Sequence, residues 1–506
     1  MYKKELPRVS PERVHIASAR VQRLIEDLER ATEMHGVMIA RGGSVIAEGW
    51  WSPYTPDMPH ILHSLGKSYV GTGVGMAVTE GKLDTEERIV DLFAEDFRAL
   101  GLTPTPLQEH LRVRHLLTMS NGMARQPKLD EHLVENYLRE PVVHAPGSVF
   151  MYNTAGTSLL CEIFRRRVGV QISEYMSEKL FQPIGIEMDK LRWMQYRSGL
   201  DASPGIAATV ENNLRLGLLY LRRGVWDGRR YLSEDWVTRA TTTQIDNAGT
   251  SPDAEACVGY GYQIWMCSVP GVFRFDGGHG QYVIVSPRHD IAISLTESAP
   301  DFGAAAKVLE TIMGFLRELD GVPETPLPED PAAAQALKAY LAARALRPGT
   351  TAPIPADIHA LDGIYHAVRG ELNIYPETRA DNTENWDSVF YSPGDWDTRA
   401  ISIAARDAGW VEISFNHTTV LKVRLDGVNE VVESRGAMPN YQLTCSTGYF
   451  DGERTLVVHT RWIQTCPDMT LTFRRYAGAL IVNAVSNTLH DFCPETVYRL
   501  ELKPVF

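Results

Sequence analysis

Ser64 and Lys67 are the residues of this chain whose types and spacing could support covalent catalysis. They lie in Ser64-Leu65-Gly66-Lys67, the one S-x-x-K pattern in the sequence. A serine hydroxyl is a poor nucleophile until a nearby base takes its proton. The segment precedes a helix-forming run at residues 69–80, and residues three apart share one face of a helix. The spacing therefore predicts a serine nucleophile at a helix amino terminus, with the lysine as its activating partner.

Lys67 needs help to act as a base at neutral pH. Its reference pKa is about 10.4, and lowering it by ~3 units costs ~4 kcal/mol and requires burial or a second cation. Tyr152, in the segment Tyr152-Asn153-Thr154, could share the proton, because a lysine and a tyrosine in contact titrate as a unit. We expect the lysine cation to lower the pKa of this tyrosine.

Each of these residues also has a purely structural interpretation. A serine at the start of a helix is usually an N-cap, and an isolated tyrosine is usually part of a core. The helix amino terminus that would hold Ser64 also presents backbone N–H groups, which could stabilise an oxyanion formed there.

The elements that must position these residues follow a clear order along the chain. A helix at residues 11–33 and a strand-turn-strand at residues 37–47 come first, followed by a mostly helical region over residues 64–245. Strand-like runs return at residues 260–266, 271–275, 282–285 and 291–295, before a helix at 302–318. This order predicts an α+β fold, in which an antiparallel sheet takes strands from both ends and a helical subdomain is inserted between them.

A second domain follows a proline-rich linker. Residues 321–328 read as an extended connection, and an alanine-rich helix follows at 331–346. From residue 361 the pattern changes to nine short strand-like runs, among them residues 388–391. We therefore predict a catalytic domain at 1–320, a linker with one helix at 321–355, and an all-β, barrel-like domain at 356–506.

Composition excludes several classes of partner. The chain has 506 residues and a formal net charge of −13, so it has no electrostatic reason to bind nucleic acid or anionic lipid. It shows neither a secretory signal pattern nor an apolar run long enough to span a membrane. Its six cysteines, Cys161, Cys257, Cys267, Cys445, Cys466 and Cys493, have no zinc-ligand spacing and are expected to be free thiols. We expect a cytoplasmic protein without metal or cofactor.

Several segments in a fixed order resemble the serine β-lactamase and penicillin-binding-protein superfamily, in which S-x-x-K carries the nucleophile. Besides the S-x-x-K and tyrosine segments, they include residues 111–120, 180–186, 259–263 and 276–287. The resemblance covers about residues 30–318 and is strongest to the branch with class C β-lactamases, related esterases and D-stereospecific aminopeptidases. It implies that Ser64 is acylated, that Lys67 activates it and that Tyr152 is a general acid/base.

The same resemblance places the family's third element, K-T-G or H-x-G, at Phe275-Asp276-Gly277. The N–H groups of Ser64 and Gly278 would then form the oxyanion hole. Phe275 stands where a Lys or His normally meets the β-lactam carboxylate, so the resemblance favours an esterase or amidase over a true β-lactamase.

The candidate substrate-binding residues near these motifs are Asn153, Thr154, Phe275, Asp276, Gly277 and His279. Thr154 stands where the family often has Asn, and Asn153 is adjacent but would point elsewhere. Asp276 could pair with Arg274, which projects from the same side of a strand, or it could receive a substrate amine. His279 could reach the pocket rim or lie on the surface.

We therefore expect a serine hydrolase for a small ester, amide or short peptide. Acyl transfer by the same residues, a D-stereospecific aminopeptidase or amidase, and a catalytically silent ligand-binding protein are the alternatives. By analogy with related aminopeptidases, an eight-stranded, lipocalin-like barrel is expected at the carboxy terminus. Formation of homo-oligomers is left open.

Overall fold

The computed structural model describes residues 5–321, 325, 327–374, 398–406, 409–434, 442–466, 468–486 and 497–504. The predicted strand at residues 388–391 and the predicted thiol Cys493 lie outside the described residues. The five described cysteines are free thiols.

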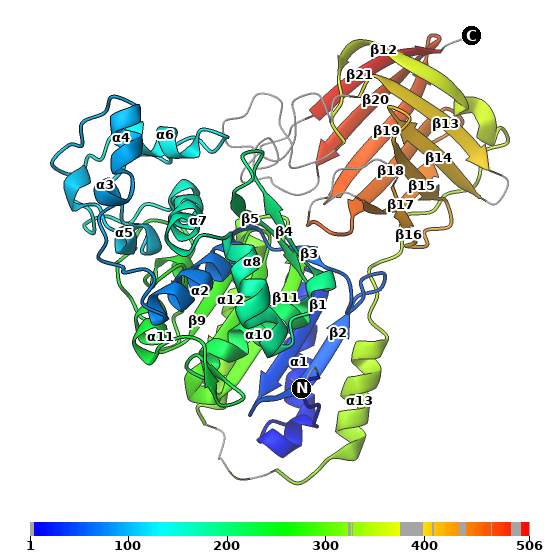
Figure 1. The fold of residues 1–506 in the computed structure, drawn as a ribbon. Helices are drawn as coiled ribbons and strands as arrows, with labels where there is room; N and C mark the ends of the chain where they lie inside the picture. Colours follow the sequence, from blue (N-terminus) through cyan, green and yellow to red (C-terminus); the bar gives the residue numbers. More distant parts are fainter. Residues whose placement is uncertain are drawn as a thin grey trace.

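A six-stranded antiparallel sheet forms the centre of the amino-terminal part (Figure 1). Its strand order is β2-β1-β11-β10-β9-β8. In the adjacent interior strands β1 and β11, Glu33 pairs with Ser298 and Arg41 with Ile291, so segments from both ends of this part of the chain meet inside the sheet. The strands are β1 (Glu33–Arg41), β2 (Ser44–Trp50), β8 (Trp265–Met266), β9 (Phe273–Gly277), β10 (Gln281–Ser286) and β11 (Ile291–Ser298).

Each face of this sheet carries its own hydrophobic core, because successive residues of a strand point to opposite faces. Val37 and Ile39 of β1 pack in the core that includes α1 and α12, whereas Met38 and Ala40 pack in the core that includes α2 and α10. Burial of both faces fixes the register of the strands, since a slip of one residue would exchange the two sets.

The helices of this part lie on both faces of the sheet and in a subdomain beside it (Figure 1). They are α1 (Ser18–Ala31), α2 (Gly66–Thr79), α3 (Ile89–Leu92), α4 (Ala94–Ala99), α5 (Val113–Leu117), α6 (Leu133–Arg139), α7 (Thr154–Val168), α8 (Ile172–Met176), α9 (Gln182–Ile184), α10 (Val210–Leu221), α11 (Glu234–Ala240) and α12 (Phe302–Leu319). Two smaller sheets complete it: β3 (His60–Ile61), β4 (Leu191–Gln195) and β5 (Asp201–Ala208) in the order β3-β5-β4, and the hairpin β6 (Val225–Trp226) with β7 (Arg229–Arg230).

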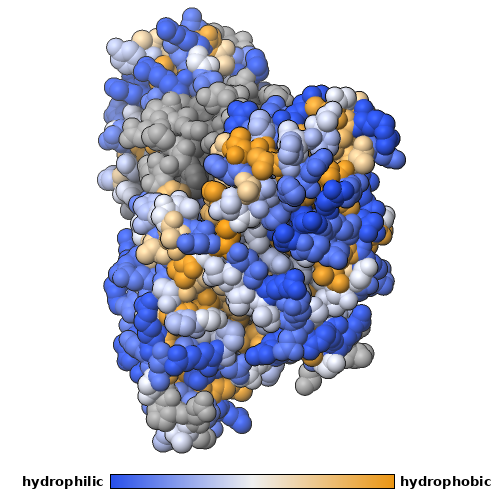
Figure 2. Space-filling view, turned by 90° about the vertical axis from the view of Figure 1, so that its left-hand side faces the viewer, coloured by the Kyte–Doolittle hydropathy of each residue, from blue (hydrophilic) through white to orange (hydrophobic). Residues whose placement is uncertain are grey.

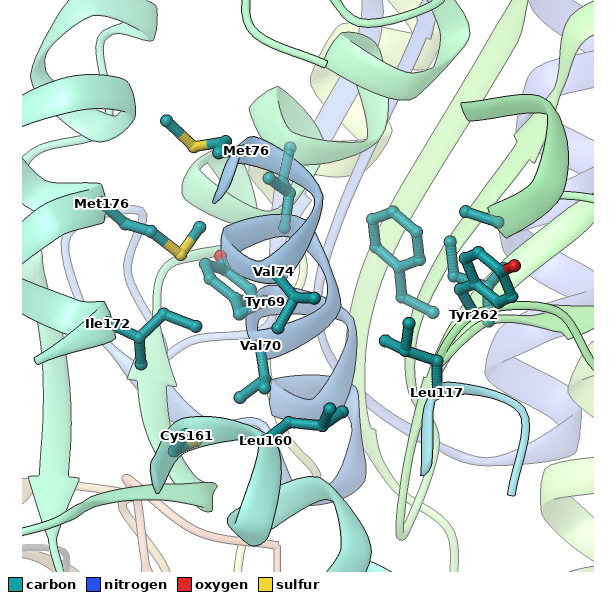
Figure 3. Close-up of a cluster of buried hydrophobic side chains, with 14 of the residues drawn as sticks. Tyr69, Val70, Val74, Met76, Leu117, Leu160, Cys161, Ile172, Met176 and Tyr262 are labelled. Carbon is teal, nitrogen blue, oxygen red and sulfur yellow. The ribbon is translucent and has the colours of Figure 1, made fainter. Parts of the chain in front are cut away.

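Helix α2 is enclosed by hydrophobic side chains from several elements (Figure 3). Its own Tyr69, Val70 and Val74 are fully buried, and Ile172 and Met176 of α8 lie beside it (Figure 3). Its glycines permit this packing, since a Cβ on Gly73 would lie 2.5 Å from Ile172 Cδ1. The helix that follows the S-x-x-K serine is therefore held in place along its length.

The molecular surface on the side of the helical subdomain is mostly hydrophilic, with hydrophobic residues in small scattered groups (Figure 2). Among the described helices, none is both long enough and apolar enough to cross a membrane.

Helix α13 (Pro331–Ala342) connects this part to the barrel. It packs against α1 and the edge strand β2, where a Cβ on Gly49 would lie 2.8 Å from Leu341 Cδ2. Arg344, just after the helix, donates a hydrogen bond of 3.1 Å to Glu29 of α1. The connection is thus fixed to the edge of the central sheet.

The carboxy-terminal part is a separate closed barrel (Figure 1). Its strands are β12 (Gly363–Glu371), β13 (Ala400–Arg406), β14 (Trp410–Phe415), β15 (Thr419–Arg424), β16 (Val431–Glu433), β17 (Leu443–Phe450), β18 (Thr455–Trp462), β19 (Asp468–Tyr476), β20 (Ala479–Ser486) and β21 (Val497–Pro504). Their order is β15-β14-β13-β12-β21-β20-β19-β18-β17-β16. The α+β fold with a separate all-β barrel confirms the fold class predicted from the sequence.

The barrel closes through β15 and β17, which pair in parallel. Nine strands form the closed ring, with β16 paired only to β17, rather than the eight expected by analogy. A ring of alternating strand directions needs an even number, so the ninth strand forces one parallel pair. Hydrophobic side chains fill the interior, including the fully buried Trp462, whose Nε1 donates a 3.0 Å hydrogen bond to Ile374 O.

Candidate active site

Ser64 lies in a short 3-10 turn, His63–Leu65, immediately before α2. The turn follows β3, and Leu62 N donates a 2.8 Å hydrogen bond to Ile206 O of β5. His63 has φ +48°, a left-handed conformation that is uncommon for a residue with a side chain. The serine is half-buried whereas its neighbour Leu65 is fully buried. The hydroxyl therefore lies on a rigid turn and remains reachable from solvent.

The Nζ atom of Lys67 lies 2.8 Å from Ser64 Oγ. The lysine is 2% exposed. Burial lowers its pKa to about 7, and the nearby carboxylate of Asp276 opposes that shift. A neutral amine in hydrogen-bond contact with a serine hydroxyl can accept the hydroxyl proton. Burial alone therefore accounts for the lowered pKa of the lysine, and no second cation is among its causes.

Tyr152 brings its phenol to the same serine. Burial raises the pKa of Tyr152, and a hydrogen bond to Ser64 lowers it by less. Lys67 Nζ lies 4.8 Å from the centre of the tyrosine ring. The expectation that the lysine would lower the pKa of this tyrosine is wrong in direction, because burial outweighs every other influence on the phenol. The phenol therefore keeps its proton at neutral pH.

Strand β9 approaches the nucleophile turn very closely at Gly277. A Cβ on this residue would lie 2.0 Å from Leu62 O and 3.1 Å from Leu65 N, so no larger residue fits there. A Cβ on the next residue, Gly278, would lie 3.8 Å from His63 Cβ. This approach brings the end of β9 beside Ser64, where the resemblance puts the second N–H of the oxyanion hole.

Asp276 forms an ion pair with Arg274, whose Nε lies 2.7 Å from Asp276 Oδ2. The arginine side chain is 1% exposed and the aspartate side chain 23% exposed. Burial raises the pKa of Asp276 above its ordinary value, although Arg274 opposes that shift. The short contact with a guanidinium gives the carboxylate a cationic partner. Both interpretations of Asp276 remain compatible with this geometry, since only one of its oxygens accepts from Arg274 Nε.

An aromatic wall, formed by Phe150, Tyr152, Tyr260 and Trp265, borders the site. The rings of Tyr152 and Trp265 stack, with centroids 5.6 Å apart and an interplanar angle of 25°. Trp265 meets Tyr260 edge-on at 4.9 Å. The sequence pattern could not separate core from pocket wall for the tryptophan, because only the fold brings it to Tyr152.

Three of the residues predicted to bind substrate face inward. Asn153 is fully buried, and its Oδ1 accepts a 2.8 Å hydrogen bond from Gly156 N as the N-cap of α7. Phe275 is fully buried and packs against Tyr220 at 5.2 Å. Thr154 is 2% exposed, and its N–H donates to Gln126 Oε1 at 2.7 Å. All three residues therefore take part in structural contacts. Gln126, which the sequence analysis did not single out, is more exposed than any of them.

His279 and His63 pack against each other beside Gly278, with ring centroids 5.4 Å apart. His279 is half-buried rather than on the surface. Burial lowers the pKa of His63 to about 4 and that of His279 to about 3. Both imidazoles next to the predicted oxyanion hole are consequently neutral at pH 7.

The barrel also contributes to this region. Cys466 Sγ lies 3.5 Å from His63 Nε2 and accepts a 3.1 Å hydrogen bond from Gln281 Nε2. Ser298 Oγ donates to Cys466 O at 2.7 Å, and Ile61 N donates to Gln464 O at 2.8 Å. No spacing in the sequence indicates these contacts, because the residues that meet are far apart along the chain.

A buried polar cluster joins the barrel to the strand that leads to Ser64. Arg461 Nη2 of β18 lies 2.8 Å from Glu33 Oε2, and His35 Nδ1 lies 3.1 Å from His60 Nε2. Burial raises the pKa of Glu33, but His35 and Arg461 lower it by more, so that it falls below its ordinary value. Among the described residues, no group of three or more His, Cys, Asp or Glu is arranged to hold a metal ion.

Comparison with known proteins relates the chain to one family. The family model for Beta-lactamase matches residues 21–310. A 6-aminohexanoate-dimer hydrolase of Paenarthrobacter ureafaciens is 26% identical over 306 residues, which cover 55% of this chain and 76% of that protein.

Two solved structures also align with the chain. A putative 6-aminohexanoate-dimer hydrolase from Bacillus anthracis aligns with TM-score 0.49 and 19% identity, over 63% of this chain and 89% of that one. The octameric penicillin-binding protein homologue from Pyrococcus abyssi aligns with TM-score 0.47 and 16% identity, over 96% of this chain and 99% of that one. With more than half of its length matched by the family model, the chain belongs to the Beta-lactamase family.

Proposed function

We propose that the protein is a serine hydrolase that cleaves an ester or amide through an acyl-enzyme on Ser64. The observation that carries the proposal is the 2.8 Å contact between Lys67 Nζ and Ser64 Oγ, made by a lysine whose pKa burial lowers to about 7. Membership of a family that includes named hydrolases supports the same reaction class.

In the acylation step Ser64 gives its proton to the neutral amine of Lys67, and Oγ attacks the substrate carbonyl carbon. The backbone N–H groups of Ser64 and Gly278 bind the oxygen that becomes negative. The proton then passes from Lys67, by way of the phenol of Tyr152, to the leaving alcohol or amine as its bond to the carbonyl breaks. The phenol regains a proton from the lysine as it gives one up, so the tyrosine is unchanged.

Deacylation repeats these steps with water. A water molecule gives a proton to Lys67 and attacks the acyl carbonyl, and the same N–H groups hold the oxyanion. Ser64 Oγ leaves as the acid product forms and recovers its proton from the lysine. Each group returns to its starting state.

The third motif supports an ester or amide substrate over a β-lactam. Phe275 is fully buried at the position where the family's Lys or His meets a β-lactam carboxylate, and the neighbouring Asp276 would repel that carboxylate. A relative that is named a 6-aminohexanoate-dimer hydrolase supports hydrolysis as the reaction. A small ester, amide or short peptide is accordingly the proposed substrate class.

Covalent labelling tests the proposal directly. We expect a fluorophosphonate probe to add one adduct to the full-length protein, located on Ser64 by peptide mass spectrometry, and Ser64→Ala to lose both the adduct and the hydrolysis of p-nitrophenyl esters. Ser148→Ala, which changes an exposed serine that bonds only to a nearby carbonyl, is the matched control and should label normally. Unchanged labelling of Ser64→Ala would refute the proposal.

A further inference from the structure

We propose that Asp276 recognises an ammonium group on the acyl part of the substrate, and that the site selects against acyl groups with a carboxylate. This inference rests on the proposed function, since it names the substrate class of the same site. It reverses the charge preference that a Lys or His in the third motif would give.

Asp276 precedes Gly277 on β9, at the point where the strand lies against the turn that holds Ser64. Its charge raises the pKa of Lys67 and of Tyr152, and its side chain is 23% exposed. A carboxylate near the nucleophile and in contact with solvent can bind a substrate cation without first being uncovered.

Arg274 holds this carboxylate but cannot itself bind a substrate anion. Its Nε donates to Asp276, and its Nη1 donates to the carbonyl oxygens of Glu255 and Met266 at 2.9 and 3.1 Å. The guanidinium is 1% exposed, and its centre lies 5.5 Å from that of the Trp265 ring. The pair thus presents its negative end to the site and keeps its positive end inside the protein.

The two imidazoles and the lysine beside Ser64 offer no permanent cation to a substrate carboxylate. The imidazoles of His63 and His279 are neutral at pH 7, since burial lowers their pKa values to about 4 and about 3. Lys67, with its pKa lowered to about 7, acts on the serine in its neutral form. A carboxylate on the substrate would therefore meet Asp276 without compensation.

Matched p-nitrophenyl esters test this selectivity in the full-length protein. The ammonium esters are those of 3-aminopropanoate and 6-aminohexanoate, the neutral ones are butanoate and heptanoate, and the anionic one is hydrogen adipate. At pH 7.5 we expect kcat/KM to be at least about tenfold higher for an ammonium ester than for its neutral match. The adipate ester should be at least about tenfold poorer than heptanoate.

Asp276→Asn should reduce the ammonium-to-neutral ratio of kcat/KM to about 1. The ratio is the readout because any change in Lys67 reactivity affects both esters equally and cancels. Asp253→Asn removes a nearby acidic charge that also acts on Asp276, and it should keep the wild-type ratio. Circular dichroism checks that both variants fold.

Two results would overturn the inference. The first is a wild-type ammonium-to-neutral ratio of kcat/KM near 1 for both matched ester pairs, a result that needs no variant to interpret. The second is a folded Asp276→Asn variant that keeps the wild-type preference for ammonium esters. If the neutral esters are still cleaved in a Ser64-dependent manner, the proposed hydrolase stands and only the ammonium selectivity falls. If wild-type protein cleaves none of the five esters, both proposals fall together.

Discussion

Cys466 of the barrel lies 3.5 Å from the imidazole of His63, the residue that precedes the proposed nucleophile. The carboxy-terminal part therefore reaches the catalytic turn directly. It is joined to the central sheet by a second contact, the ion pair between Arg461 and Glu33 at 2.8 Å.

Loss of that ion pair should destabilise the full-length protein. Arg461→Met leaves Glu33, whose side chain is 33% exposed, with His35 as its remaining partner, and we expect the free energy of unfolding to fall by about 2 kcal/mol in urea titrations. The stabilisation from Glu33 should also be lost as the pH falls through its lowered pKa, because a protonated carboxyl no longer pairs. Arg406→Met breaks an exposed pair with Glu412 and should cost less than about 1 kcal/mol. Equal effects of the two variants would contradict the prediction.

The rate of ester cleavage should depend on the protonation of Lys67. Because the base must be neutral and its pKa is about 7, kcat/KM should rise with pH through about 7 and fall about tenfold per unit below pH 6. A pH profile with a stable ester measures this, and Lys67→Ala should lose most activity while remaining folded. A flat profile between pH 5 and 8 would remove the lysine from the proposed role.

Asp276 should influence the pH at which kcat/KM rises. Its carboxylate raises the pKa of Lys67, so Asp276→Asn is expected to move this rise in kcat/KM to lower pH. The comparison uses the neutral butanoate ester, to avoid any effect on ammonium binding. A shift to higher pH would mean that the carboxylate does not act on the lysine.

Tyr152→Phe should lower the rate of acylation more than the binding of substrate. The phenol keeps its proton at neutral pH because burial raises its pKa, and its proposed role is to pass a proton to the leaving group. We expect kcat to fall by about 10²–10⁴-fold, with a smaller loss for a p-nitrophenyl ester, whose leaving group needs little protonation, than for an alkyl ester. Equal losses for both leaving groups would argue for a purely structural tyrosine.

Gly277 should tolerate no side chain. A Cβ there would lie 2.0 Å from Leu62 O, so Gly277→Ala must move β9 away from the nucleophile turn, and we expect kcat/KM to drop at least about tenfold. Gly314→Ala places a methyl group in open space on α12 and should raise the unfolding free energy by about 0.5–1 kcal/mol. Wild-type activity in Gly277→Ala would show that this close approach is not needed.

Sequence reasoning works best here where the determining contacts are local. The contact between Ser64 and Lys67 follows from three-residue spacing at a helix start, and the antiparallel sheet follows from the order of periodic segments. Contacts between distant segments leave no such pattern, which is why Cys466 and the ninth barrel strand were not anticipated. The reversed shift of the Tyr152 pKa depends on burial, which becomes known only when Trp265 and Tyr260 are placed around the ring.

The pairing of β1 with β11 in the centre of the sheet has a consequence for synthesis on the ribosome. The strand β1, which contains Glu33, emerges early, whereas its neighbour β11 ends at Ser298. One edge of β1 therefore stays unpaired until most of the amino-terminal part has been translated. The surroundings of the serine are completed later still, once Gln464 and Cys466 have emerged. A nascent chain released before that point would carry Ser64 without the neighbours that the barrel supplies.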